Sequence, residues 1–449
     1  MNKIHVCLLA SLFATSLVAG CGKEGADTGP AASPEEGKKQ VETPAMSTDP
    51  VTLTVFVMPT IDDPTLKKFY EDPIRKKYPF LSLKFVKHDA KRSYANEFQD
   101  MIVTGSAPDL VISSINTISN VIEANLQTDL TPLIQKHRLD LSIYDNGIMD
   151  IVKSISAKGE IYGFPLFNNS SSMVYNKDLF DRFGVAYPKD GMTWEQTIEL
   201  ARKLTRNEGG TQYRGLMLPL NYMLTANSLS LTLLDPKTDK AIQNSDKWKY
   251  MFETWKQVFE IPGNEVMPAN YETYIEDFTK KRNVAMFAGF SMLPNIESLN
   301  DPTLNWDMVS LPVFKEAPKT GTQLLATFIA ATSAGKYKEQ SFAAMSALLD
   351  PEVQAMYARS GSQILMKDPE LKKEFAKDLK TAQGKNTQAA FVNSLAPFPA
   401  MSKYELAVRS ILYDKYREYV TTAKDTNTIL REMEEAVNKK AEAEKAAAK

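Results

Sequence analysis

The sequence predicts an α/β protein with two domains. From residue 51 on, segments with the alternating pattern of β-strands are followed by segments with the apolar spacing of helices. Such an order implies right-handed crossovers and largely parallel sheets with helices on both faces. About 400 residues follow residue 51, which is more than one hydrophobic core usually holds, so we expect two domains.

The first elements are regular. Period-two alternation with β-branched residues predicts strands at residues 51–58 (VTLTVFVM), 81–87 (LSLKFVK) and 108–113 (PDLVIS). Apolar spacing between them predicts helices at residues 63–79, with an interruption near Pro73, and at residues 90–105.

A second set of elements follows residue 172. Asn176 and Gly184 have the positions of a helix N-cap and a helix stop, and Thr193 and Gln196 have the spacing of a capping box. Further strands are predicted at residues 283–290, 305–314 and 324–333, and further helices at residues 337–350 and from about residue 404 onward. The charged, Ala-rich residues 434–449 are expected to form a solvated or frayed end.

Five polar residues at positions 168–172 (NNSSS) interrupt a strand-like segment that spans residues 164–180. A surface loop is one interpretation of this run. A ligand cleft crossed by the backbone is the other, and the strand-like flanks at residues 164–167 and 173–175 favour it.

The N-terminus has the pattern of an export signal. Residues 1–20 combine one lysine, a short apolar core and small residues before Cys21, as in a signal peptide. Residues 22–50 are rich in Gly and Pro and poor in apolar residues, which is typical of a flexible linker. The cysteine after Ala-Gly resembles that of bacterial lipoprotein signals and implies lipidation of Cys21; a plain signal peptide is the alternative.

The composition excludes several classes of chemistry. The only two cysteines are Cys7 and Cys21, so the rest of the chain has no thiol for a disulfide or a catalytic thiolate. His88 and His137 are isolated, and no metal, phosphate-loop, dinucleotide or nucleophile-elbow motif occurs, so no metal and no cofactor is expected. A formal net charge of −2 without a basic stripe argues against nucleic acid as a partner.

Several aromatic residues have the spacing of a packed helix face. Packing is therefore preferred over iron binding for Tyr413, Tyr416 and Tyr419, and over sugar stacking for Trp248 and Trp255. Packing is also preferred for Trp194, at a first helical turn, and for Trp306, inside a predicted strand. A pair of carboxylates assembled by the fold, as in a glycosidase, stays open because no acid is singled out by the sequence.

Residues 159–205 resemble the extracellular solute-binding proteins of bacterial ABC importers, in the carbohydrate-binding group that includes maltose-binding protein. The similar motifs are Ile-Tyr-Gly-x-Pro, Tyr-Asn-Lys-Asp-Leu-Phe and a Thr-Trp-Glu helix start. Residues 105–113 and 283–292, the segment NWDMVSLPVF and the segment FPAMSKYELAVRSIL are similar in the same order.

This resemblance implies a two-lobed periplasmic-binding-protein-like fold, with a mixed, mostly parallel sheet in each lobe and a ligand cleft at the hinge. The expected first lobe comprises residues 51–167 and 321–365, and the second lobe residues 168–320 and 366–449. The chain should first cross between lobes at residues 167–169 and again near residues 318–323.

The resemblance also implies a ligand site. Asn116 and Asn169 match family positions where an acid often holds sugar hydroxyls, and Ser291 one where a tryptophan can stack. The predicted ligand-binding residues are Thr60, Asp62, Asn116, Phe167, Asn168, Asn169, Phe290, Ser291 and Tyr404.

The implied function is a substrate-binding lipoprotein without catalytic activity, on the outer face of the membrane. It is expected to be a monomer that captures a sugar or oligosaccharide and delivers it to the transmembrane subunits of an ABC permease. The alternatives are a receptor of the same fold for a non-sugar ligand, a sensor partner, and a surface carbohydrate-active enzyme.

Overall fold

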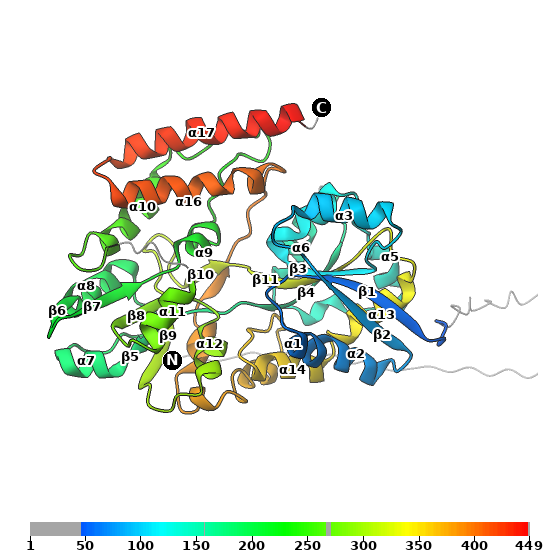
Figure 1. Cartoon of the computed structure of the whole chain (residues 1–449), viewed down its shortest axis with the longest axis horizontal. Coiled ribbons are helices and arrows are strands. Elements are labelled where there is room, and N and C mark those ends of the chain that lie inside the picture. The colour runs from blue at the N-terminus through cyan, green and yellow to red at the C-terminus, as the bar shows by residue number, and fades with distance from the viewer. Residues whose placement is uncertain (1–45, 157, 266–270, 448–449) are drawn as a thin grey trace, which may run out of the picture. The chain divides into compact units, whose positions relative to one another are not determined.

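The computed structural model describes residues 46–156, 158–265 and 271–447. Two five-stranded sheets organise this part of the chain (Figure 1). The first sheet has the strand order β2 (Leu81–Lys87), β1 (Val51–Val57), β3 (Leu110–Ser114), β11 (Ala326–Ala331) and β4 (Gly163–Asn168). Four of these strands run in one direction, and β11 runs antiparallel between β3 and β4.

The second sheet has the order β6 (Arg206–Glu208), β7 (Thr211–Met217), β8 (Val284–Phe290), β5 (Ser171–Asn176) and β9 (Trp306–Ser310). A mixed, mostly parallel sheet was predicted for each lobe, but this sheet is mostly antiparallel: β7 and β8 are the one parallel pair among the described neighbours. The reason is that β5 enters directly from the first sheet and runs antiparallel between β8 and β9. A separate pair joins β10 (Thr320–Gln323) to β12 (Ser394–Ala396).

The first sheet shares one hydrophobic core with the helical segments around it. These are α1 (Asp63–Leu66), η1 (Lys67–Glu71), α2 (Asp72–Lys77), α3 (Tyr94–Val103), η2 (Ile115–Thr117), α4 (Ile118–Glu123), α5 (Thr131–His137), η3 (Leu141–Ile143), α6 (Ile148–Ser154), α13 (Lys338–Ala347), α14 (Pro351–Arg359) and α15 (Pro369–Lys373).

The second sheet has a core on each face, because successive residues of a strand point to opposite sides. Met173 and Tyr175 of β5 lie in one core and Val174 in the other. One face packs against α7 (Lys177–Phe183), α8 (Trp194–Leu204), α9 (Leu220–Thr225), α10 (Asp246–Phe259), α16 (Glu405–Thr421) and α17 (Thr426–Ala447). The other packs against α11 (Tyr271–Thr279), α12 (Met292–Leu299), η4 (Lys380–Ala382) and η5 (Thr387–Phe391).

Local sequence signals set many of these boundaries. Asn176 caps α7, which ends at Gly184 with a left-handed φ of 65°. Thr193 and Gln196 form the predicted capping box at the start of α8. The packing prediction for the aromatic residues is confirmed. All four tryptophans are at most 1% exposed, Tyr416 and Tyr419 are buried in one core of the second sheet, and Tyr413 packs against that core.

Pro73 explains the interruption of the first helix. A proline has no N–H to donate to the carbonyl four residues earlier, which is that of Phe69. The chain adopts a π-helical turn, η1, just before this point. The buried Tyr357 hydroxyl of α14 donates to the Phe69 oxygen at 2.8 Å, so the carbonyl that Pro73 leaves open is paired.

Replacing Tyr357 with phenylalanine should therefore destabilise the protein by about 1–3 kcal/mol, the cost of an unpaired buried acceptor. Tyr416→Phe is the matched control, because the buried Tyr416 hydroxyl has no hydrogen-bond partner in the described part of the chain. Its removal should be neutral or stabilising. Urea unfolding of both variants checks this, and equal losses of stability would contradict the assignment.

The C-terminal segment forms a regular helix. The charged end is not frayed in the described residues, since α17 continues to Ala447, and most of its side chains after residue 434 are exposed or half-buried, as expected for a solvated helix. Ile429, Met433, Val437 and Ala441 recur at intervals of four and are fully buried in the core that α10 and α16 share. One apolar residue per turn, among charged neighbours, is enough to anchor this helix.

An ion-pair network adds to the packing of α17 on α16. Glu432 accepts from Lys424 at 2.7 Å and from Lys415 at 3.0 Å, and these hydrogen bonds lower the pKa of Glu432 to about 2. A carboxyl whose pKa is lower in the folded state stabilises the fold above the unfolded pKa, near 4.5, and loses this effect as the pH falls towards 2.

Glu432→Gln should accordingly make the thermal midpoint less dependent on pH between 4.5 and 2. Circular dichroism melts across this range provide the measurement. Glu435→Gln is the control, because in the described part of the chain Glu435 pairs only with Arg431 of the same helix. Parallel pH profiles for Glu432→Gln and the wild type would refute the role of this network.

Candidate functional site

The polar run at residues 168–172 connects the two sheets. β4 ends at Asn168 in the first sheet, and β5 begins at Ser171 in the second, so only Asn169 and Ser170 lie between them. In each sheet, the ends of several strands lie at this connection, and these ends are called the sheet's edge. In the first sheet, β3 ends and β11 begins there, with Ser114 opposite Thr327. In the second, β8 ends there, with Phe290 opposite Ser171.

A second connection runs beside the first. After β9 the chain passes through β10 and enters the first sheet at Ala326. The Thr322 hydroxyl donates to the Ser171 hydroxyl at 3.1 Å, and the Asn169 N–H donates to the Leu325 carbonyl at 3.2 Å. The expected second crossing near residues 318–323 therefore lies close to the observed path.

Asn169 and Ser291 come together at this edge. The Ser291 hydroxyl donates to the Asn169 side-chain oxygen at a long 3.4 Å, and the Ser291 N–H donates to the Ser170 carbonyl at 2.9 Å. Ser291 has a left-handed φ of 49° at the start of α12. Both side chains are half-buried, so amide and hydroxyl groups are presented at the connection between the sheets.

Asn168, also predicted to bind ligand, has a different environment. Its side chain is fully buried, and its oxygen accepts the Leu325 N–H at 2.8 Å. Its amide nitrogen donates to the Gln363 side-chain oxygen at 2.7 Å. These protein contacts occupy the groups that a ligand would use.

The predicted aromatic platforms are mostly packed. Phe167 lies 4.9 Å from the Tyr357 ring, and Phe290 is only 4% exposed. Tyr404 is half-buried at the start of α16, with the Lys403 and Lys445 ammonium groups 4.9 and 6.0 Å from its ring centre.

The remaining predicted residues follow β1 and β3. Thr60 and Asp62 are exposed in the turn after β1. The Asp62 carboxylate accepts the Thr65 N–H at 2.7 Å and caps α1, and hydrogen bonds from Thr65 lower its pKa. Asn116 lies in η2, directly after β3.

Sequence reasoning missed Tyr222. Its side chain is 47% exposed on the short helix α9, which directly follows β7, and its ring centre lies 6.0 Å from that of Phe290. β7 ends at the same edge as β8, because the two strands are parallel with Met217 opposite Phe287. Recognising β7 in the sequence would have placed Tyr222 at the end of a strand, where ligand contacts are expected.

A buried carboxylate holds the segment beside α16. Glu405 accepts the N–H groups of Leu233 at 2.7 Å and Leu234 at 3.0 Å. Burial raises the pKa of Glu405, and the two backbone hydrogen bonds partly oppose the shift. The contacts make Glu405 a structural anchor for residues 233–234, next to Tyr404.

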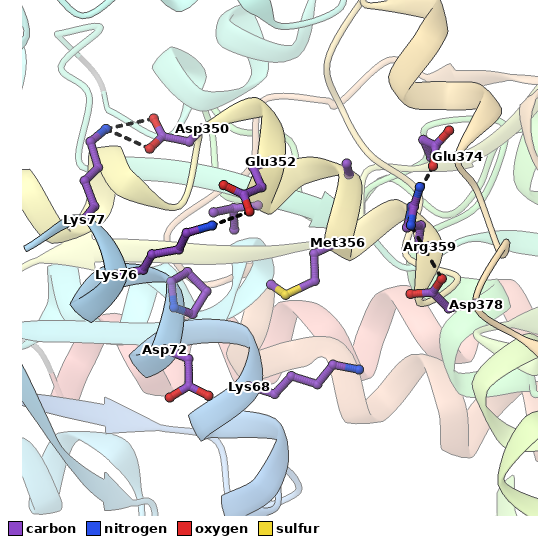
Figure 2. A pocket seen from close by; sticks show the side chains of 13 residues that line it. Lys68, Asp72, Lys76, Lys77, Asp350, Glu352, Met356, Arg359, Glu374 and Asp378 are labelled. Carbon is purple, nitrogen blue, oxygen red and sulfur yellow. Dashed lines mark hydrogen bonds and ion pairs between the residues drawn. The ribbon is translucent and has the colours of Figure 1, made fainter.

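Two cavities lie elsewhere. Figure 2 shows one of about 950 Å³ between α2 and α14, where exposed ion pairs such as Lys77 with Asp350 surround Met356. Exposed pairs of this kind contribute little to stability. A second cavity, of about 750 Å³, lies between α6 and the segment around β12. Neither is lined by a predicted ligand-binding residue.

The two isolated histidines are paired structurally. His88 lies 2.6 Å from the Glu97 carboxylate and stacks on Tyr94, and His137 lies 2.7 Å from Glu339. Across the described residues, no group of three or more His, Cys, Asp or Glu side chains is arranged to hold a metal.

The predicted signal peptide and Cys21 lie outside the described residues. No helix between residues 46 and 447, as described, is long and apolar enough to span a bilayer.

The sheet edges at the connection therefore combine hydroxyl and amide groups with an exposed aromatic ring. A neutral polyhydroxylated ligand suits such a surface, since its hydroxyls need hydrogen bonds and its apolar face can lie on a ring. Asn169, Ser291 and Tyr222 are the side chains best placed for these contacts.

Comparison with known proteins yields a family and a fold. The profile of the family described as "Bacterial extracellular solute-binding protein" matches residues 85–355, more than half of the chain. The arabinooligosaccharide-binding protein of Bacillus subtilis (strain 168) is 25% identical over 217 residues, which cover 46% of this chain and 43% of that protein. The chain is thus matched over less than half the length of this relative.

Solved structures align over most of the chain. An ABC substrate-binding protein from Listeria monocytogenes in complex with cycloalternan has a TM-score of 0.70 at 18% identity and covers 86% of this chain and 98% of its own. The sugar-binding protein MalE from Xanthomonas citri has a TM-score of 0.71 at 14% identity, with 88% and 99% covered. These matches show the two-lobed fold of periplasmic binding proteins.

Proposed function

Because the chain belongs to the family of bacterial extracellular solute-binding proteins, we propose that it is the substrate-binding component of an ABC importer. It captures an oligosaccharide between the edges of its two sheets and presents it to the transmembrane subunits of a permease. The observation that carries this proposal is the meeting of Asn169 and Ser291 at the sheet connection, with Tyr222 exposed nearby.

The ligand class is supported by two kinds of observation. Amides, hydroxyls and an aromatic ring are the groups that hold a neutral sugar, and paired catalytic carboxylates are not among the residues identified at this edge. The curated relative is an arabinooligosaccharide-binding protein, and the structural relatives include complexes with sugars.

We extend the proposal to the location of the protein. A signal peptide at residues 1–20 would direct export, and a lipid chain such as palmitate on Cys21 would hold the folded part at the outer face of the membrane. Labelling of cells with a fatty-acid analogue, with Cys21→Ser as comparison, tests this part by itself.

A thermal-shift panel, together with mass spectrometry of co-purified ligand, tests the function. A ligand at one hundred times its Kd stabilises the folded state by about 2.7 kcal/mol, so a cognate oligosaccharide should raise the melting temperature clearly. A shift with peptides or metal chelates alone would favour a non-sugar receptor. Release of reducing ends from a glycan would favour an enzyme.

A further inference from the structure

The buried side chain of Asn168 joins segments that are distant in sequence. Its oxygen accepts the Leu325 N–H of the second connection, and its nitrogen donates to Gln363. The main chains of Asn168 and Gln363 also pair, with N–H to carbonyl distances of 2.7 and 3.1 Å. Gln363 in turn donates its side-chain N–H to the Ala390 carbonyl at 2.8 Å.

The direction of each hydrogen bond in this chain is fixed. A backbone N–H can only donate, so the Asn168 oxygen faces Leu325 and its NH₂ group faces Gln363. A backbone carbonyl can only accept, so the NH₂ group of Gln363 faces Ala390 and its oxygen faces Asn168. Each of the two side-chain amides therefore has only one orientation in which its donor and its acceptor are both paired.

These hydrogen bonds link segments that pack in the cores of both sheets. Phe164 and Leu166, which precede Asn168 in β4, belong to the core of the first sheet. Leu325 packs in one core of the second sheet, and Ala390 packs in the other. An apolar side chain at position 168 could fill the space, but it could not connect these three segments.

We propose that Asn168 and Gln363 form an amide clamp, which makes the segments that join the two sheets move as one hinge. Asn168 is then a positioning residue and not a ligand contact. The proposal rests on the proposed function, because a common hinge keeps Asn169 and Ser291 aligned for a ligand held from both sheets. Without the clamp each segment could bend separately, and the two edges would lose their alignment.

Hydrogen exchange of the ligand-free protein tests the clamp directly. Asn168→Asp keeps an acceptor for Leu325 but loses the donor to Gln363. Asn264→Asp is the matched control, because Asn264 is similarly buried and its side chain, within the described residues, hydrogen-bonds to Leu216 and Val258 in the second sheet's core and not across the connection. Gln363→Met, at a half-buried position, serves as a second variant if Asn168→Asp does not fold.

We expect both clamp variants to raise the exchange rates of the backbone amides at positions 169 and 363 at least tenfold, with a wider range of particle dimensions in X-ray scattering. The control should lower the melting temperature without these changes. Equal exchange at Asn169 and Gln363 in the clamp and control variants would overturn the proposal.

Titration with an arabino-oligosaccharide and with cycloalternan adds a functional readout, in which the clamp variants should bind at least tenfold more weakly. If the wild type binds neither sugar, the exchange result still decides the clamp, and titration with a wider panel of oligosaccharides decides the ligand class.

Discussion

Tyr222→Ala should weaken oligosaccharide binding about thirtyfold or more while leaving the melting temperature nearly unchanged. The loss corresponds to about 2 kcal/mol, as for an aromatic residue that dominates a binding surface. Tyr222 is 47% exposed, so truncation removes little buried area, yet its ring lies at the edge where the second sheet meets the connection. Isothermal titration calorimetry and a thermal melt give the two quantities.

Tyr337→Ala is the control for this experiment. Tyr337 is 38% exposed and directly precedes α13. It follows the end of β11 that is opposite to the connection. Its truncation should leave the affinity unchanged. If both variants bind as the wild type does, the ligand does not contact Tyr222 and the site must be placed elsewhere.

Gly163→Ala should destabilise the protein by about 3 kcal/mol, near the upper end for overpacking in a core. Gly163 lies in β4 opposite Ala330 of β11. A methyl group there would come within 2.2 Å of the Ile329 carbonyl oxygen and 2.5 Å of the Phe328 ring. β4 leads into the first connection and β11 follows the second, so neither strand can shift without disturbing the site.

Gly105→Ala separates this steric effect from the conformational freedom of glycine. Gly105 has a φ of 68° and no atom within 4 Å of the added methyl group. The Gly105→Ala variant should lose only about 1 kcal/mol of unfolding free energy, the cost of a left-handed conformation for alanine. Chemical unfolding of the two variants provides the comparison, and an equal loss for both would contradict the packing described for β4.

Where local patterns dominate, the sequence predicted the fold closely. The strand at residues 81–87 and the caps of α7 and α8 were identified because alternation and capping chemistry are encoded within a few residues. β7 was missed because Arg214 and Gly215 break its apolar pattern, and Tyr222 was missed with it.

The site was harder to predict because neighbouring residues play opposite roles. β4 is buried on both faces from Gly163 to Leu166, and Asn168 at its end is fully buried although its side chain is polar. Its partners, Leu325 and Gln363, lie more than 150 residues away and are supplied only by the fold. Asn169 remains a predicted ligand contact.

Isothermal titration of the purified protein with arabino-, malto- and manno-oligosaccharides and cyclic glucans tests the central claim most directly. We predict one binding site with a Kd in the micromolar range or tighter for at least one of these sugars, corresponding to about −8 kcal/mol or better. A folded protein that binds none of them would contradict the assignment of this chain as a carbohydrate receptor.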